Sequence, residues 1–277
     1  MHAARQAAWT ASTYGSTAVR VALRGHPARP RREERLVFVV GSPRSGTTFL
    51  GGALGAQPGW VDLGEVPLLK AAVPDLVALA PEEQGLEVRR ILERVRRLAF
   101  VRRLRAVEQN PETTYVLAGA FHAYPQARAV HAVRDGRDVV CSLLERGWFR
   151  DGRGGTDDAR QLYGAYARFW VEPERREEFE RVSEARRAAW AWRRYVTAAR
   201  AAGRRVVEVR YERLVGDPDG EAERLADELD GDTDALRRAF AGVHARSVGR
   251  WRRDLTREQL ADVEAEAGDL LAELDYA

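Results

Sequence analysis

The stretch that decides the fold is Leu36–Leu50, whose sequence is LVFVVGSPRSGTTFL. Its first five residues are apolar, a glycine-bounded loop follows, and apolar residues then recur at the spacing of an α-helix. This order predicts a buried strand, a tight loop and a helix. A helix that begins after a parallel strand directs unpaired backbone N–H groups and its positive dipole end at one point. We therefore expect this loop to bind a phosphate-like anion; the alternative is a glycine-rich connection without a ligand.

The glycine spacing of this loop equals that of a nucleotide-binding P-loop, but the residue types differ. Thr47 stands where such a loop has its lysine, and the only lysine of the chain is Lys70. The strong cation of the loop is Arg44, whose planar guanidinium suits a tetrahedral oxyanion. We expect the hydroxyl groups of Thr47 and Thr48 to add further donors.

Composition indicates one α/β domain. The chain has 277 residues, and 45% of them are hydrophobic, which suffices for one core of ordinary size. The net charge is +3 and the pI is about 9.2, which suits polyanionic small molecules as well as nucleic acid. A single cysteine, Cys141, excludes an internal disulfide and predicts a reducing, cytoplasmic location. No apolar run approaches the ~20 residues that span a bilayer.

A second anion site is predicted where residues 128–133 form a buried strand. Arg134 follows that strand directly, at the edge where open α/β sheets bind ligands. Ser142 and Arg146 are four residues apart on the helix that we expect next, so both face the same side. The three side chains are therefore expected to converge on one anion.

The segment Pro43–Thr48 resembles the 5′-phosphosulfate loop of sulfotransferases, in the arginine form of bacterial members and tyrosylprotein sulfotransferases. The resemblance covers about residues 36–276 and includes Arg134 and Ser142 as a 3′-phosphate site. It implies a three-layer, P-loop-like α/β domain with a mostly parallel central sheet flanked by helices. It also implies 3′-phosphoadenosine 5′-phosphosulfate (PAPS) as the sulfuryl donor and a small-molecule or peptide hydroxyl acceptor, with neither a metal nor nucleic acid. The donor-binding residues that it implies are Pro43, Arg44, Ser45, Gly46, Thr47, Thr48, Arg134, Ser142, Arg146, Tyr211 and Arg250.

The same resemblance implies Glu65 as the general base, with Arg44 beside it in catalysis. A carboxylate is needed because a neutral hydroxyl is a weak nucleophile; the alternative for Glu65 is a place at a helix start before Pro67. Tyr211 is expected to face the adenine, with a core tyrosine as the alternative. The chain departs from the family at Gln109, where a lysine is usual. Either another cation, most directly Arg44, replaces it, or transfer is slower.

Three other segments have two interpretations each. Residues 1–35 predict a basic N-terminal extension with one helix, or a targeting peptide, ahead of a sulfotransferase-like domain at 36–277. Residues 86–107 predict a long amphipathic helix whose eight arginines form a solvated face or attract an acidic acceptor. Residues 147–180 hold a glycine-rich loop and an aromatic stripe, which predict a lid over the site or part of the core.

Two rival functions stay open. The first is a P-loop kinase for a small molecule, which the missing loop lysine disfavours. The second is a nucleotide-binding protein without catalysis, which only Gln109 supports. A homodimer is compatible with the sequence.

Overall fold

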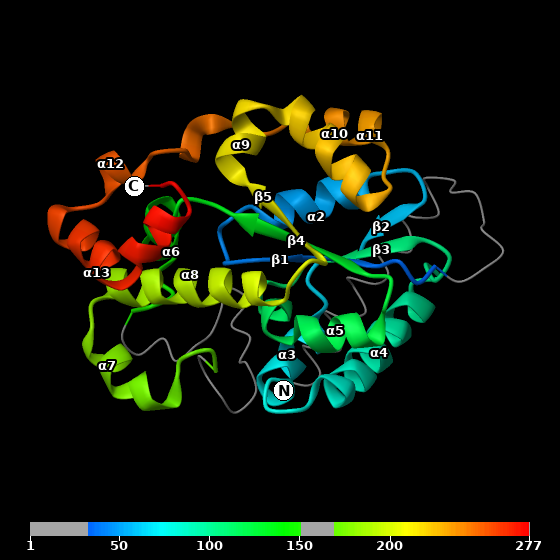
Figure 1. The fold of residues 1–277 in the computed structure, drawn as a ribbon, viewed down its shortest axis with the longest axis horizontal. Helices are drawn as coiled ribbons and strands as arrows, with labels where there is room; N and C mark the ends of the chain where they lie inside the picture. The colour runs from blue at the N-terminus through cyan, green and yellow to red at the C-terminus, as the bar shows by residue number, and fades with distance from the viewer. Residues whose placement is uncertain (1–32, 151–168, 277) are drawn as a thin grey trace.

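The computed structural model describes residues 33–150 and 169–276, and its centre is a parallel β-sheet (Figure 1). The sheet has five strands in the order β2-β3-β1-β4-β5, and all neighbouring pairs are parallel. The strands are β1 (Val37–Val40), β2 (Trp60–Asp62), β3 (Arg105–Glu108), β4 (Arg128–Val133) and β5 (Val206–Arg210). The predicted α/β class with a parallel sheet is confirmed.

Helices cover both faces of the sheet. The side chains of β1 point alternately to the two faces and are buried on both. Val37 and Val39 pack on one face, and Phe38 and Val40 pack on the other. The first face is covered by α2 (Thr47–Gly55), α9 (Tyr211–Gly216), α10 (Pro218–Leu229) and α11 (Thr233–Phe240). The second is covered by α3 (Pro67–Leu76), α4 (Pro81–Leu98), α5 (Leu117–Ala123) and the short 3₁₀ helix η1 (Pro111–Val116). These layers form the three-layer arrangement in Figure 1.

A third hydrophobic cluster lies beyond β4. It is built by α6 (Gly136–Arg146), α7 (Arg176–Arg181), α8 (Glu184–Ala201) and α13 (Arg257–Glu273). The 3₁₀ helices η2 (Pro173–Arg175) and η3 (Ala245–Ser247) and the short α12 (Trp251–Asp254) complete the described elements. In this cluster Trp190 and Trp192 are fully buried. Trp192 donates its indole N–H to the carbonyl of Arg134, 3.1 Å away, so the cluster supports the end of β4.

The prediction of one helix over residues 86–107 was wrong at its C-terminal end. Helix α4 ends at Leu98, and Arg105 begins strand β3. Arg105 can occupy a buried strand because its guanidinium stacks 4.5 Å from the Trp60 ring centroid and donates to the carbonyl of Leu229. The arginines of α4 do not form one solvated face either, since Arg96 is fully buried and forms a 2.8 Å ion pair with Glu93.

The aromatic stripe is described only in part. Trp170 is buried and makes edge-to-face contacts with Phe149 and Phe179, so this residue belongs to the core. Phe169 is also described and makes an edge-to-face contact with Tyr115, with 5.2 Å between the ring centroids. Tyr163, Tyr166, the predicted glycine-rich lid and the predicted extension up to residue 32 lie outside the described residues.

Candidate active site

Five of the predicted site residues lie just beyond the carboxyl ends of the five strands. Because the five strands are parallel, these ends meet at one edge of the sheet. Beyond these ends lie Glu65 after β2, Gln109 after β3, Arg44 after β1, Arg134 after β4 and Tyr211 after β5. Neighbouring strands are about 4.8 Å apart. The edge therefore runs from a carboxylate at β2, through the phosphate-type loop at β1, to an arginine and a tyrosine at β4 and β5.

The loop after β1 has the backbone geometry of an anion cradle. Gly41 has a φ of 129°, and a Cβ there would lie 2.4 Å from the carbonyl oxygen of Ala132, so only glycine fits. Gly46 has a φ of 98° and precedes α2 with no side-chain cap. The first turn of α2 thus directs its backbone N–H groups toward the site, which is the predicted arrangement.

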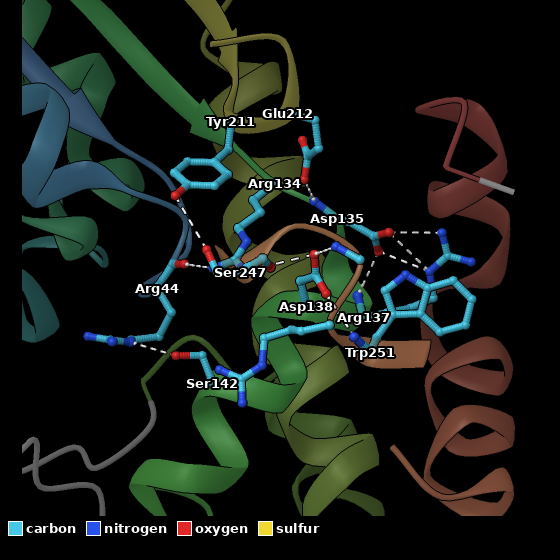
Figure 2. Close-up of polar contacts among 12 residues, drawn as sticks. Arg44, Arg134, Asp135, Arg137, Asp138, Ser142, Tyr211, Glu212, Ser247 and Trp251 are labelled. Atoms are coloured by element: carbon cyan, nitrogen blue, oxygen red, sulfur yellow. Dashed lines mark hydrogen bonds and ion pairs between the residues drawn. The ribbon is translucent and has the colours of Figure 1, made fainter. Parts of the chain in front are cut away.

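Arg44 joins the two predicted anion motifs, as Figure 2 shows. Its Nε donates a 2.9 Å hydrogen bond to the hydroxyl of Ser142 on α6. Its carbonyl oxygen accepts a hydrogen bond of 3.2 Å from Nη1 of Arg134. The backbone of Arg44 has a φ of 73°, a left-handed conformation that is uncommon for a residue with a side chain. The loop after β1 is thus tied to both β4 and α6.

Arg134 lies between the loop and Tyr211. Its side chain is buried, its Nη2 donates to the carbonyl of Ser247, and its guanidinium carbon lies 5.0 Å from the Tyr211 ring centroid (Figure 2). Two buried donors at this place, Arg134 Nε and Ser45 Oγ, have no hydrogen-bond partner among residues 33–150 and 169–276. Buried donors of this kind are normally satisfied, so both fit a site for an anionic ligand.

A cavity of about 260 Å³ brings six of the predicted residues together. These are Arg44, Gly46, Thr47, Thr48, Arg134 and Tyr211. Its other lining residues were not predicted from the sequence: Phe49, Gly242, Val243 and His244. Tyr211 is tied to this second group because its hydroxyl donates a 3.0 Å hydrogen bond to the carbonyl of His244. The loop around Gly242 has no periodic pattern that could have identified it.

The remaining predicted residues lie outside the lining of this cavity. Ser142 contacts Arg44, as described, and Arg146 is exposed one turn further along α6. Arg250 forms ion pairs with Glu145 and, at 2.7 Å, with Asp254. These two carboxylates raise the pKa of the Arg250 guanidinium above its ordinary value. The described contacts of the Arg250 side chain are therefore with carboxylates.

Asp138 holds the chain segment around Arg250 in place. This carboxylate is fully buried and accepts backbone hydrogen bonds from Gly249 at 2.7 Å and Trp251 at 3.0 Å (Figure 2). Burial raises its pKa above the ordinary value, against the opposing effect of these hydrogen bonds. Because Ser247 precedes this anchor and contacts both Arg134 and Tyr211, Asp138 fixes one wall of the site. Sequence patterns gave no sign of this role.

Glu65 lies at the other end of the edge and has an ionic partner. The Nζ of Lys70 is 2.7 Å from Oε2 of Glu65 and 4.0 Å from Oε2 of Glu112. The Lys70 side chain is 6% exposed, whereas that of Glu65 is 34% exposed. Helix α3 begins two residues after Glu65, so the residue also has the helix-start position of the alternative interpretation. The proposed base is thus a solvent-accessible carboxylate held by a buried ammonium group.

Two kinds of feature are absent from residues 33–150 and 169–276. No group of three or more histidine, cysteine, aspartate or glutamate side chains there is arranged to hold a metal ion. None of the helices described is both long enough and apolar enough to cross a membrane.

Comparison with known families decides the class of protein. A model described as the sulfotransferase family matches residues 88–235, which is more than half of the 277 residues. The chain belongs to the sulfotransferase family. The matched range of this sulfotransferase includes Arg134, Ser142 and Tyr211, whereas the loop around Arg44 and Glu65 precede it. No curated protein sequence matches the chain.

Solved structures resemble this sulfotransferase in fold. A sulfotransferase domain of the Synechococcus PCC 7002 olefin synthase is 19% identical with a TM-score of 0.53, and the match covers 87% of this chain and 98% of that one. A sulfotransferase domain from the curacin biosynthetic pathway is 14% identical with a TM-score of 0.56 and the same coverage. Sulfotransferase STF9 from Mycobacterium avium is 14% identical with a TM-score of 0.51 and covers 97% of this chain and 84% of its own. These matches do not support the resemblance to tyrosylprotein sulfotransferases.

Proposed function

We propose that this enzyme transfers the sulfuryl group of PAPS to a hydroxyl acceptor, with Glu65 as general base. The observation that carries the proposal is the pair of hydrogen bonds from Arg44 to Ser142 and from Arg134 to Arg44. They bring two anion-binding motifs, far apart in the sequence, against one cavity. A donor with a phosphosulfate and a second, separate phosphate matches that arrangement of cations.

The order of the strands supports one placement of the donor. Its 5′-phosphosulfate would lie on the loop after β1, where the start of α2, Arg44, Thr47 and Thr48 supply donors. Its 3′-phosphate would lie beside Arg134, whose buried Nε lacks a partner among the described residues. Its adenine would lie toward Tyr211. In this placement the acceptor approaches from β2 and β3, on the side of Glu65.

In this placement some residues act on the acceptor hydroxyl and others on the departing phosphate. The donor supplies an activated sulfuryl group: the acceptor oxygen forms a bond to sulfur while the bond from sulfur to the phosphate oxygen breaks. Glu65 removes the hydroxyl proton, for which a positioned carboxylate contributes typically ~10²- to 10⁴-fold. Arg44 and the N–H groups at the start of α2 stabilise the negative charge that the departing phosphate gains.

The test is a transfer assay with radiolabelled PAPS and a panel of acceptors: a phenol, a tyrosine peptide, a sugar and an aliphatic alcohol. We expect label on at least one acceptor, and we expect Glu65→Gln to lower turnover ~10²-fold or more with unchanged donor affinity. Phosphoryl transfer from ATP with Mg²⁺, and none of sulfate, would instead establish the kinase. If the chain binds PAPS tightly but transfers sulfate neither to an acceptor nor to water, it is a nucleotide-binding protein without catalysis.

A further inference from the structure

The only lysine of the chain is buried beside the proposed base. Lys70 lies in the first turns of α3 and is 5% exposed. A buried ammonium group is costly unless carboxylates pair with it. Its nearest described partner is Glu65, at 2.7 Å, and Glu112 is further away at 4.0 Å. Nζ of Lys70 thus donates a direct hydrogen bond to Oε2 of Glu65.

A third carboxyl group, Glu108, ends the neighbouring strand β3 and interacts electrostatically with Glu65 and Glu112. It is fully buried and accepts hydrogen bonds from Asn110 Nδ2 at 2.6 Å and Thr113 Oγ1 at 3.0 Å. Burial, together with the charges of Glu65 and Glu112, raises its pKa to about 8 against the opposing effect of its hydrogen bonds. At neutral pH Glu108 is therefore mostly protonated. The single ammonium group then serves the two carboxylates of Glu65 and Glu112.

We propose that Lys70 is a positioning residue for Glu65, which fixes the orientation of the carboxylate for proton removal. This inference rests on the proposed function. The ammonium group binds Oε2, whereas Oε1 of Glu65 has no hydrogen-bond partner among the residues that the structure describes. One oxygen is held, and the other stays available for the acceptor hydroxyl. Lys70 acts through Glu65 and makes no contact with the donor in this account.

The position of Gln109 is consistent with this role. The family's usual lysine is absent there, and the Gln109 side chain is 5% exposed with an Oε1 that lacks a partner among the described residues. The ammonium group of this chain instead comes from α3 and approaches Glu112, three residues further along from Gln109. The positive charge near the β3 end is thus supplied from a different element.

A purely structural role for Lys70 is the competing explanation. In that case the lysine serves to neutralise Glu112, whose side chain is 2% exposed, and its effect on catalysis would be indirect. In the first explanation the loss of kcat in a Lys70 variant acts through Glu65, and in the second it acts through Glu112. Variants of Glu65 and Glu112 therefore separate them.

The experiment measures sulfuryl transfer from radiolabelled PAPS by the full chain, with the acceptor identified from the panel and with water as the acceptor. We expect Lys70→Met to lower kcat ~10- to 100-fold, with the affinity for adenosine 3′,5′-bisphosphate unchanged. Lys70→Arg should recover most of the rate. In a Glu65→Gln background, Lys70→Met should cause no further loss.

Glu112→Gln is the matched control, since it removes the other partner of Lys70 and leaves Glu65 intact. We expect it to change the melting temperature more than kcat. A loss of kcat in Glu112→Gln equal to that in Lys70→Met would overturn the proposal, as would a full additional loss in the Glu65→Gln background. Wild-type kcat in Lys70→Met would overturn it as well. If the wild-type chain itself transfers no sulfuryl group, the proposed function fails first, and this inference fails with it.

Discussion

Arg44 and Ser142 are 98 residues apart in the sequence and are joined by a 2.9 Å hydrogen bond from the guanidinium Nε to the hydroxyl. This contact means that the loop after β1 and the helix after β4 form one binding surface. A ligand that orders one of them acts on the other as well. The first prediction concerns this bond.

Ser142→Ala should weaken the binding of adenosine 3′,5′-bisphosphate ~10- to 100-fold, because a hydrogen bond to a charged group is worth about 1.5–3 kcal/mol. Titration calorimetry measures the change. The control is Ser183→Ala, which removes the N-cap of α8, where the hydroxyl accepts from Arg186 N at 3.1 Å. That variant should lose about 1 kcal/mol of stability. Equal binding by wild type and Ser142→Ala would mean that the serine does not support the site.

Asp138→Asn should loosen the wall formed by residues 247–251. An amide offers one acceptor oxygen where the carboxylate accepts from both Gly249 and Trp251, so one partly buried N–H loses its partner. We expect the free energy of unfolding to fall by about 1–3 kcal/mol, together with weaker donor binding. Chemical denaturation and calorimetry measure the two effects. Asp254→Asn is the control, because this carboxylate lies at the surface and its ion pairs should contribute less to stability. Unchanged donor affinity in Asp138→Asn would separate this wall from the binding site.

Two adjacent glycines in α2 should respond in opposite ways to alanine. A Cβ on Gly51 would lie 2.8 Å from Cγ of Gln109, whereas a Cβ on Gly52 meets no atom within 4 Å. Gly51→Ala should therefore cost about 1–3 kcal/mol through overpacking. Gly52→Ala should stabilise the helix by about 0.5–1 kcal/mol. Urea denaturation of the two variants tests this, and stabilisation by both would show that the Gln109 side chain can move aside.

Burial of Glu108 should make stability fall as the pH rises. Its pKa is about 8 in the folded protein and 4.5 ordinarily, so the folded state holds a proton that the unfolded state releases between these values. The slope is at most about 1.4 kcal/mol per pH unit. Below pH 7 the buried His131, whose pKa burial lowers to about 3, contributes with the opposite sign. The free energy of unfolding should therefore be compared at pH 7 and pH 8, where the contribution of Glu108 dominates over that of His131.

Denaturant unfolding of the wild type and Glu108→Gln at these two pH values tests the Glu108 prediction. We expect the free energy of unfolding to fall with pH in the wild type and to change less in the variant. Parallel losses in both proteins would assign the dependence to another group.

The sequence predicted those parts of the molecule that local patterns encode. The strands before Gly41 and before Arg134 are mostly apolar runs that end in glycine or arginine, and both lie as predicted, as does the loop between β1 and α2. Such runs specify a buried parallel strand whatever surrounds it. The roles assigned to Glu65 and Arg250 stay predictions.

The parts that sequence analysis missed depend on contacts between distant segments. Strand β3 begins with an arginine and ends with a glutamate, and these charges are tolerated only because Arg105 stacks on Trp60 and Glu108 is hydrogen-bonded by Thr113. The anchoring role of Asp138 depends on Gly249, which is 111 residues away. Neither contact produces a periodic pattern of residue types that sequence analysis could detect.

Calorimetric titration of the full chain with adenosine 3′,5′-bisphosphate, 5′-AMP and ATP tests the central claim most directly, because it needs no acceptor. We predict that the bisphosphate binds at least ~10- to 100-fold more tightly than 5′-AMP, since each charge-assisted bond to a 3′-phosphate is worth about 1.5–3 kcal/mol. Arg134→Ala should erase this preference. Equal affinities for the bisphosphate and 5′-AMP, or tighter binding of ATP with Mg²⁺, would contradict the assignment of PAPS as the donor.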